Sequence, residues 1–232
     1  SGTVLAVGQN VTKLKKGDEV CALLKGGGYA EYVCAPALQC LSIPSGVSLL
    51  DAGALPETFC TVYTNLIDRG ALRKGECVLI QGGTSGIGYT AIQIAKFIGA
   101  KVLATGRTIE KCDAIRRFGA DRAINYVEED FEIIAKDFTD GNGVDVILDI
   151  VGGTYIPKEL NILAKNGRLV FVNLRAGKVV EADFGQIHAK HLTVTGSRLR
   201  PRSIAEKAAI CRSLQQKIWP AFGTGDIEVE VF

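Results

Sequence analysis

The sequence predicts an α/β protein built around a doubly wound parallel sheet, and three observations lead to this fold class. From Glu76 onward, short apolar segments alternate with amphipathic ones. Several apolar segments, "CVLI" and "VDVILDI" among them, are apolar on both faces, as strands covered by helices on both sides of a sheet must be. A glycine loop, "GGTSGIG", separates the first apolar segment from the first amphipathic one. This alternation implies right-handed crossovers between parallel strands.

Six strands are expected in this part of the chain, with helices between most of them. The strands are Cys77–Gln81, Lys101–Thr105, Arg122–Tyr126, Val144–Ile150, Arg168–Val172 and His191–Thr195. The clearest helices are Ile87–Ile98 and Thr108–Phe118. The first of these carries an apolar stripe of isoleucine and alanine at helical spacing, and Gly99 is well suited to end it.

The two ends of the chain carry different patterns. Residues 1 to about 50 consist of strand-like segments, "TVLAVG", "DEVCAL", "YAEYVCAP" and "CLSIP", separated by turns. "SLLDAGALPETFCTVYTNLIDRGAL" predicts helices broken near Pro56, and "RSIAEKAAICRSLQQKIWPAF" predicts a final amphipathic helix. The closing "DIEVEVF" again has the pattern of a strand, and the chain has no methionine, so we expect residues to be missing from both ends.

Composition argues against several classes of function. The 232 residues are 47% hydrophobic and carry a net charge of only +2, so a sizeable core is expected and a nucleic-acid or membrane partner is not. No apolar run approaches the ~18 residues of a membrane span. The seven cysteines are scattered, without a C-x-x-C pair or a signal peptide, which predicts reduced thiols in a cytoplasmic protein.

The glycine loop has the pattern of a dinucleotide-binding turn, with a purely structural turn as the alternative. Gly83, Gly86 and Gly88 form G-x-x-G-x-G, in which the first glycine permits a tight turn, the second a close approach to a pyrophosphate, and the third close packing of helix on strand. The backbone N–H groups of Ser85, Gly86 and Ile87 would face the phosphates at the helix N-terminus. The candidate cofactor-binding residues of the loop are Gly83, Thr84, Ser85, Gly86, Ile87 and Gly88.

The segment "ATGRTIEK" predicts NADPH as the dinucleotide. An NAD enzyme usually carries Asp or Glu about 20 residues after the loop, at the end of the second strand. Here Gly106 and Arg107 occupy that place, followed by Thr108 and Lys111. The two cations would attract a 2′-phosphate. The alternative is that Arg107 and Lys111 are ordinary solvated charges.

Two related classes of dehydrogenase do not fit. Short-chain dehydrogenases have their glycine loop near the N-terminus and a Tyr-x-x-x-Lys pair, whereas here the nearest pair is Tyr155 and Lys158, one residue too close. Zinc alcohol dehydrogenases carry a cysteine-rich zinc lobe, but only Cys34 and Cys40 occupy that part of this chain. The pair formed by His188 and His191 has no third ligand in view and is interpreted as structural, so no metal is expected.

The order of several segments resembles one family closely. "SGTVLAVGQNVTKLKKGDEV", "GGGYAEY", "LPETFCTVYTNL", "LRKGECVLIQGGTSGIGYTAIQIAK", "GADRAINY", "GVDVILDIVGG" and "LTVTGSRLRPRS" are similar to segments of the zeta-crystallin-like NADPH:quinone oxidoreductases, in the zinc-free branch of the medium-chain dehydrogenase/reductase superfamily. The resemblance covers essentially the whole chain. It implies a partial GroES-like catalytic domain over 1–58, a Rossmann NADPH-binding domain over 59–200, and a last helix over 201–232.

The resemblance also implies roles for individual residues. Ser85, Gly86 and Ile87 would hold the pyrophosphate, Lys111 and Tyr126 would contact the 2′-phosphate region with help from Thr108, and Thr61 would lie beside the nicotinamide. Further candidates come from loops after the later strands, where open α/β sheets bind ligands: Val151, Asn173, Leu174, Ser197 and Arg198. For Tyr126 the alternative is an aromatic side chain that covers the core at a strand end.

The expected reaction is hydride transfer from NADPH to a quinone or an activated enone. No residue is a compelling acid or base, which quinone reduction tolerates because protons are available from water. The alternatives are a non-catalytic NADPH-binding protein, and an enoyl-thioester reductase whose carrier channel would be lined by Arg198, Arg200 and Arg202. The family resemblance implies a homodimer through the edge strand "HLTVTGS", in which Leu192 and Val194 alternate with polar residues.

Overall fold

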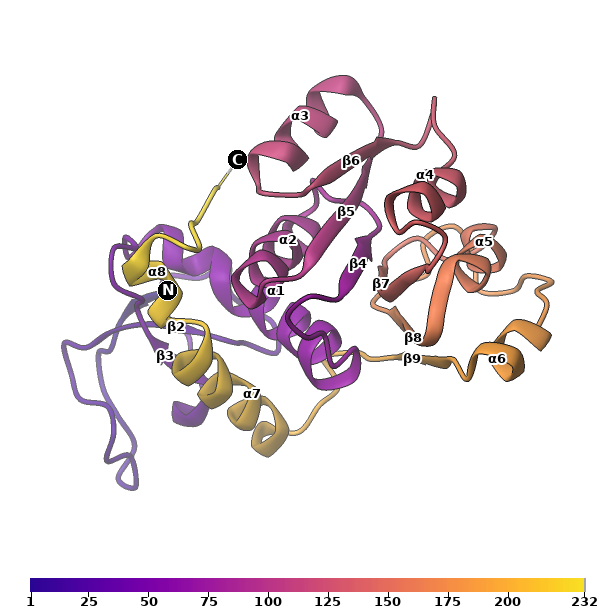
Figure 1. Ribbon diagram of the computed structural model, residues 1–232. Coiled ribbons are helices and arrows are strands. Elements are labelled where there is room, and N and C mark those ends of the chain that lie inside the picture. Colours follow the sequence, from indigo (N-terminus) through magenta and orange to yellow (C-terminus); the bar gives the residue numbers. More distant parts are fainter. Residues whose placement is uncertain (232) are drawn as a thin grey trace. The chain divides into compact units, whose positions relative to one another are not determined.

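The structure, a computed structural model, describes residues 1–231, so Phe232 lies outside the described residues. The chain divides into two compact units (Figure 1). Unit 1 consists of Ser1–Tyr63 and the chain from Arg198 onward, and unit 2 consists of Thr64–Ser197. The C-terminal segment therefore belongs to the same unit as the N-terminal one.

Unit 2 is a six-stranded parallel sheet with helices on both faces. Its elements are η3 (Tyr63–Arg69), β4 (Cys77–Ile80), α2 (Gly86–Ile98), β5 (Lys101–Gly106), α3 (Ile109–Arg117), β6 (Arg122–Asn125), α4 (Phe131–Phe138), β7 (Val144–Asp149), α5 (Tyr155–Ile162), β8 (Leu163–Phe171), α6 (Gly185–Lys190) and β9 (Thr193–Gly196). The strand order β6-β5-β4-β7-β8-β9 reverses direction between β4 and β7, which is where doubly wound sheets bind nucleotides. The predicted fold class is confirmed.

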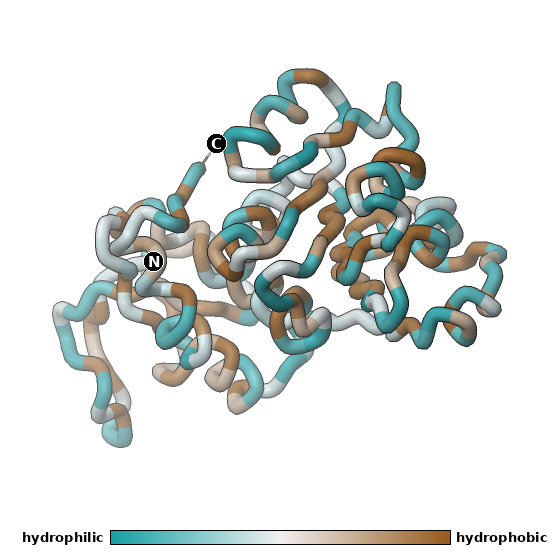
Figure 2. The backbone as a smooth tube through the Cα atoms, in the orientation of Figure 1, coloured by the Kyte–Doolittle hydropathy of each residue, from teal (hydrophilic) through white to brown (hydrophobic). Residues whose placement is uncertain are grey.

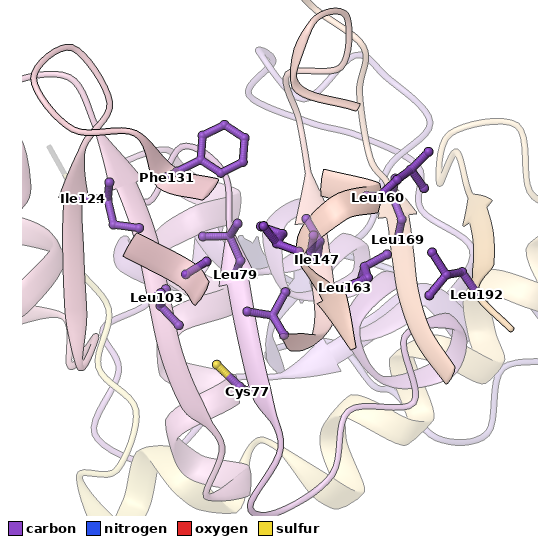
Figure 3. Close-up of a cluster of buried hydrophobic side chains, with 13 residues drawn as sticks. Cys77, Leu79, Leu103, Ile124, Phe131, Ile147, Leu160, Leu163, Leu169 and Leu192 are labelled. Atoms are coloured by element: carbon purple, nitrogen blue, oxygen red, sulfur yellow. The ribbon is translucent and has the colours of Figure 1, made fainter. Parts of the chain in front are cut away.

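The core of unit 2 explains why its strands are apolar on both faces. On one face, side chains from neighbouring strands pack together with the helices α4 and α5, as Figure 3 shows for Leu79, Leu103 and Ile147 beside Phe131 and Leu160. On the other face, α2 and α3 cover the residues that alternate with these. Most residues of β4 and β5 are coloured as hydrophobic in Figure 2. Both faces of the sheet are therefore buried.

Four of the six strands begin at the predicted residue and two do not, while every strand end differs from the predicted one by a single residue. β8 begins at Leu163, before the predicted start at Arg168, and includes a register irregularity against β7. β9 begins at Thr193 because His191 adopts a left-handed conformation, with φ of 56°, at the end of α6. A residue with this backbone conformation ends a helix and cannot open a strand.

Unit 1 contains a small antiparallel sheet and the terminal helices. Its elements are β1 (Gly2–Thr3), β2 (Glu19–Ala22), η1 (Ala37–Gln39), β3 (Cys40–Ser42), η2 (Asp51–Ala54), α1 (Leu55–Val62), α7 (Ile204–Lys217) and α8 (Pro220–Thr224). The strand order is β1-β2-β3. Pro56 lies in the first turn of α1, where a missing N–H costs nothing, and the helical turn η2 precedes it.

Four expectations for unit 1 are wrong. Of the strand predicted at "TVLAVG", only Thr3 lies in a strand, because β1 ends there. The segment "YAEYVCAP" is not a strand: no strand of residues 1–231 pairs with it, and Tyr29 and Tyr32 are exposed. The final helix is two helices, because Pro220 starts α8 and cannot continue the hydrogen bonding of α7. Residues 226–231 form no strand, and the last residue of "DIEVEVF", Phe232, lies outside the described residues.

Candidate dinucleotide site

The loop after β4 turns on a glycine that the motif did not single out. Gly82 has a φ of 75°, which L side chains rarely adopt, so it makes the tight turn that the sequence reading assigned to Gly83. Gly83 is needed for another reason. A Cβ there would lie 2.8 Å from Ile115 Cδ1 and 2.9 Å from Ala104 Cβ, because the loop runs directly over β5 and α3.

Gly88 allows α2 to start directly on the loop. A Cβ at Gly88 would lie 2.3 Å from Gly82 O and 2.7 Å from Gly83 C. Ser85 caps the same helix: its Oγ accepts a hydrogen bond from the Gly88 N–H at 3.0 Å and donates one to Gly82 O at 2.9 Å. Hydrogen bonds among the residues of the loop therefore stabilise its conformation.

The start of α2 offers a site for an anion. The Ser85 N–H was predicted to face the phosphates. It donates instead to Gly82 O at 3.1 Å, within the loop itself. Within residues 1–231, by contrast, no protein acceptor is assigned to the N–H groups of Gly86 and Ile87. These two donors lie in the first turn of a thirteen-residue helix, where the helix dipole attracts negative charge.

The loop after β5 carries the predicted cations. Gly106 is buried, and a Cβ there would lie 3.0 Å from Ile115 Cδ1. Arg107 and Lys111 are exposed, and Thr108 caps α3 by accepting the Lys111 N–H at 3.3 Å. Glu110 also lies in the first turn of α3.

Glu110 is a carboxylate in the same segment, and the prediction of NADPH left its charge out of account. The Thr108 hydroxyl bonds to it and lowers the pKa of Glu110, although its side chain is fully exposed. An anionic group thus lies beside the two cations of this loop, and it opposes the binding of a phosphate there.

Tyr126 follows β6 at the same end of the sheet. Its N–H donates to Gly106 O at 3.1 Å, which ties it to the loop after β5. Its ring is 39% exposed and meets the Tyr155 ring edge-on at 6.5 Å. The Tyr155 ring in turn packs on Phe131 at 5.0 Å. Tyr126 is therefore a partly exposed aromatic side chain at the carboxyl ends of the strands.

Most of the remaining candidate cofactor-binding residues lie in the loops that follow β7, β8 and β9. The Val151 N–H donates to Asp149 Oδ1 at 2.6 Å, and Asn173 Oδ1 accepts the N–H of Leu174 at 2.8 Å. Ser197, just after β9, donates its hydroxyl to Asn65 Oδ1 at 2.9 Å. Because carboxyl ends of parallel strands meet at one edge of a sheet, these residues share that edge with the glycine loop.

Two candidates fall in unit 1, whereas the others belong to unit 2. Thr61 is 7% exposed on α1, and Arg198 is exposed at the start of the second segment of unit 1. Their roles toward a nicotinamide or a phosphate remain predictions.

A buried polar cluster beneath the glycine loop was missed. It consists of Gln81, Thr105, Asp149 and Glu159, each at most 1% exposed. The available signal was a polar residue at or just after the end of an apolar strand, as in "CVLIQ" and "VILD". Burying polar groups is costly, so such positions indicate a network with assigned partners.

Comparisons with known proteins place the chain in a family. The family described as zinc-binding dehydrogenase matches residues 86–212, more than half of the chain, and the alcohol dehydrogenase GroES-like domain matches residues 1–45. The chain belongs to the zinc-binding dehydrogenase family. Among proteins of that kind it is similar in particular to quinone oxidoreductases and to enoyl reductases.

Three relatives illustrate this similarity. The quinone oxidoreductase of Homo sapiens is 30% identical over 200 residues, which are 86% of this chain and 60% of that protein. The structure of the Escherichia coli quinone oxidoreductase complexed with NADPH is 28% identical with a TM-score of 0.83, covering all of this chain and 71% of that one. The CurK enoyl reductase structure is 26% identical with a TM-score of 0.85, covering 99% and 68%. The chain spans 54% to 60% of the length of the quinone oxidoreductases and quinone oxidoreductase-like proteins among its curated relatives.

The zinc in the family's description does not fit the described residues. Over residues 1–231, no group of three or more His, Cys, Asp or Glu side chains is placed to hold a metal ion. His188 lies in the last turn of α6 and His191 ends that helix. No helix in the same residues is long and apolar enough to cross a membrane.

Proposed function

We propose that the full-length protein transfers hydride from NADPH to a quinone or an activated enone. The observation that carries the proposal is the glycine loop, whose Gly86 and Ile87 N–H groups have no assigned protein acceptor in residues 1–231. Arg107 and Lys111 after the next strand supply positive charge where an NAD enzyme has a carboxylate. The similarity to a quinone oxidoreductase complexed with NADPH supports the choice of cofactor.

The chain's own residues bind and orient. When bound, the nicotinamide cofactor supplies the hydride. The Gly86 and Ile87 N–H groups hold its pyrophosphate, and the absence of a Cβ at Gly88 lets helix and loop approach each other closely enough to present them. Lys111 and Arg107 attract the 2′-phosphate, with Tyr126 beside them. By family resemblance Thr61 would contact the nicotinamide, and no protein acid is required because water can supply the protons of the reduced acceptor.

The test of this function is NADPH oxidation by the full-length protein in the presence of an ortho-quinone. We expect turnover well above the rate of the protein-free blank. An enoyl thioester is the second substrate to assay, because the CurK enoyl reductase is also similar in fold. Turnover of the thioester alone would assign the reductase to that class, and tight NADPH binding with no turnover of either would assign a non-catalytic role.

Replacing Lys111 with alanine is expected to weaken NADPH binding roughly tenfold and NADH binding very little, since a charge-assisted contact to phosphate contributes about 1.5 kcal/mol or more. Fluorescence titration of both cofactors measures this. Glu110→Gln is the matched control in the same turn of α3: removing its charge should strengthen NADPH binding. Equal losses of NADPH and NADH on Lys111→Ala would show that the 2′-phosphate lies elsewhere.

We further propose that the protein is a cytoplasmic homodimer. β9 is the end strand of the sheet, and its Val194 is 41% exposed, so the strand offers an unpaired edge to a second copy. Its seven cysteines are free thiols, which supports a reducing compartment. The mass of the full-length protein in solution tests the dimer. No nucleic-acid or membrane partner is expected from the net charge of +2.

A further inference from the structure

A directed chain of hydrogen bonds runs beneath the glycine loop. The Gly82 N–H donates to Thr105 Oγ1 at 2.9 Å, and the Thr105 hydroxyl donates to Gln81 Oε1 at 2.9 Å. Gln81 Nε2 then donates to Glu159 Oε1 at 3.1 Å. Because each group accepts from one neighbour and donates to the next, the donor and acceptor assignments of this chain are fixed.

The chain ends at the loop that follows β7. Asp149 Oδ1 accepts the Val151 N–H at 2.6 Å, and Asp149 Oδ2 accepts the Gly152 N–H at 2.9 Å. The carboxyl groups of Asp149 and Glu159 are both fully buried, and each influences the pKa of the other through a side-chain interaction. The cluster thus connects the loop after β4 with the loop after β7. These two loops lie on either side of the point where the strand order changes direction.

Chemistry requires one proton on this carboxyl pair. Both side chains are fully buried, and over residues 1–231 neither forms an ion pair with a lysine or arginine. Ionising both of two adjacent buried carboxyl groups would cost a large amount of free energy. Asp149 accepts two backbone N–H groups and is the better anion, whereas Glu159 Oε2 has no donor directed at it. The proton therefore belongs on Glu159 Oε2.

The pKa directions agree with this assignment. Burial raises the pKa of Glu159 well above its ordinary value of 4.5, and the charge of Asp149 raises it further. Burial also raises the pKa of Asp149, while the Val151 and Gly152 N–H groups lower it. The environment thus favours a neutral Glu159 facing a charged Asp149.

We propose that Glu159, in its protonated form, is a positioning residue for the dinucleotide site. Its Oε2–H donates to Asp149 and closes a continuous hydrogen-bond chain that holds the glycine loop and the Val151–Gly152 loop in one fixed arrangement. The inference rests on the proposed function for the identity of the ligand. Its consequence is that loss of the Glu159 proton, as the pH rises through its raised pKa, places two charges side by side, breaks the chain and weakens dinucleotide binding.

The sign of the stability effect follows from the raised pKa. Between pH 4.5 and the higher folded-state pKa of Glu159, the folded protein binds more protons than the unfolded chain. The contribution of Glu159 to stability is therefore fully present at acid pH. It declines as the pH rises through this window.

Other titratable groups lie on the helix of Glu159 and on the helices α4 and α6 that contact it. Tyr155 lies on the same helix, and burial raises the pKa of its hydroxyl. Lys158 of that helix pairs with Asp130 at 2.7 Å. Burial lowers the pKa of Lys190 of α6, which donates to the carbonyl oxygens of Leu160 and Asn161. From α4, Glu132 pairs with Lys136 at 2.8 Å. Because Tyr155 and Lys190 also have shifted pKa values, the experiment must isolate Glu159.

Glu159→Gln provides that isolation. A glutamine amide has nearly the shape of a protonated carboxyl group, accepts from Gln81 through its oxygen and donates to Asp149 through its nitrogen, but has no proton to lose. Fluorescence titration of NADPH across neutral and alkaline pH should show an affinity loss in the unaltered protein. Glu159→Gln should bind within about threefold of it at neutral pH and should lack that loss. Glu159→Leu, which cannot bond to either partner, should bind about tenfold more weakly at every pH.

An alkaline loss in Glu159→Gln equal to that of the unaltered protein would overturn the proposal. Infrared spectroscopy gives a second readout that needs no ligand. The unaltered protein at neutral pH should show the C=O band of a neutral buried carboxylic acid, and Glu159→Gln should lack it. Absence of the band from the unaltered protein would also overturn the proposal. Failure of NADPH to bind at any pH would contradict the proposed function instead, and the infrared band would then decide the proton assignment alone.

Discussion

Gly88→Ala is expected to destabilise the protein by about 3 kcal/mol and to abolish measurable NADPH binding at concentrations that saturate the unaltered protein. The added Cβ would lie 2.3 Å from Gly82 O and 2.7 Å from Gly83 C. Both are backbone atoms of the loop that presents the phosphate-binding N–H groups, so no side chain can move aside. In an open helical position the same change would stabilise by up to about 1 kcal/mol. Thermal unfolding should show a melting temperature lower by roughly 6–12 °C.

Gly223→Ala is the matched control. Gly223 is also helical, in α8, but a Cβ there would meet Ser45 Cβ at 3.6 Å and Ser45 Oγ at 3.9 Å, which are ordinary van der Waals contacts. This variant should be neutral or slightly stabilised and should bind NADPH normally. If Gly88→Ala behaved like Gly223→Ala, the close packing of α2 on the loop would be disproved.

Thr105→Val is expected to destabilise the protein by about 2–4 kcal/mol, although valine has nearly the same shape. The Thr105 hydroxyl accepts the Gly82 N–H and donates to Gln81 Oε1, and the side chain is 1% exposed. Removing it leaves the buried Gln81 Oε1 and the partly buried Gly82 N–H without their partner, at about 1–3 kcal/mol each before any relaxation. Since Gly82 is then released, NADPH affinity should fall as well. Urea unfolding and fluorescence titration measure the two effects.

Thr64→Val is the opposite case in the same unit. Thr64 is also 1% exposed, but its hydroxyl has no hydrogen-bond partner within residues 1–231. Valine there removes a buried unsatisfied group, so stability should be unchanged or should rise by about 1 kcal/mol. Equal effects of the two valine substitutions would contradict the hydrogen-bond assignment for Thr105.

The sheet of unit 2 was predictable because its signals are local. A strand apolar on both faces, such as Val144–Asp149, and a helix with an apolar stripe, such as Gly86–Ile98, are each visible within a short window. Unit 1 was less predictable because antiparallel strands depend on partners distant in sequence. The residues from Tyr29 to Pro36 have strand composition but no paired neighbour in the described chain.

The same distinction applies to the site. The glycine loop was readable because a close backbone approach allows only glycine at Gly83 and Gly88. The identity of the turning residue was not readable, because adjacent glycines have the same freedom and only Gly82 takes a positive φ. The carboxyl pair of Asp149 and Glu159 is set by the packing of α5 against the sheet, which no local pattern encodes.

Calorimetric titration of the full-length protein with NADPH and with NADH tests most directly whether unit 2 binds the phosphorylated dinucleotide. We expect saturable binding of NADPH, tighter than that of NADH by roughly tenfold if one charge-assisted phosphate contact makes the difference. Tighter binding of NADH would contradict the assignment of Lys111 to the 2′-phosphate. Saturable binding of neither cofactor would contradict the assignment of the glycine loop to the pyrophosphate.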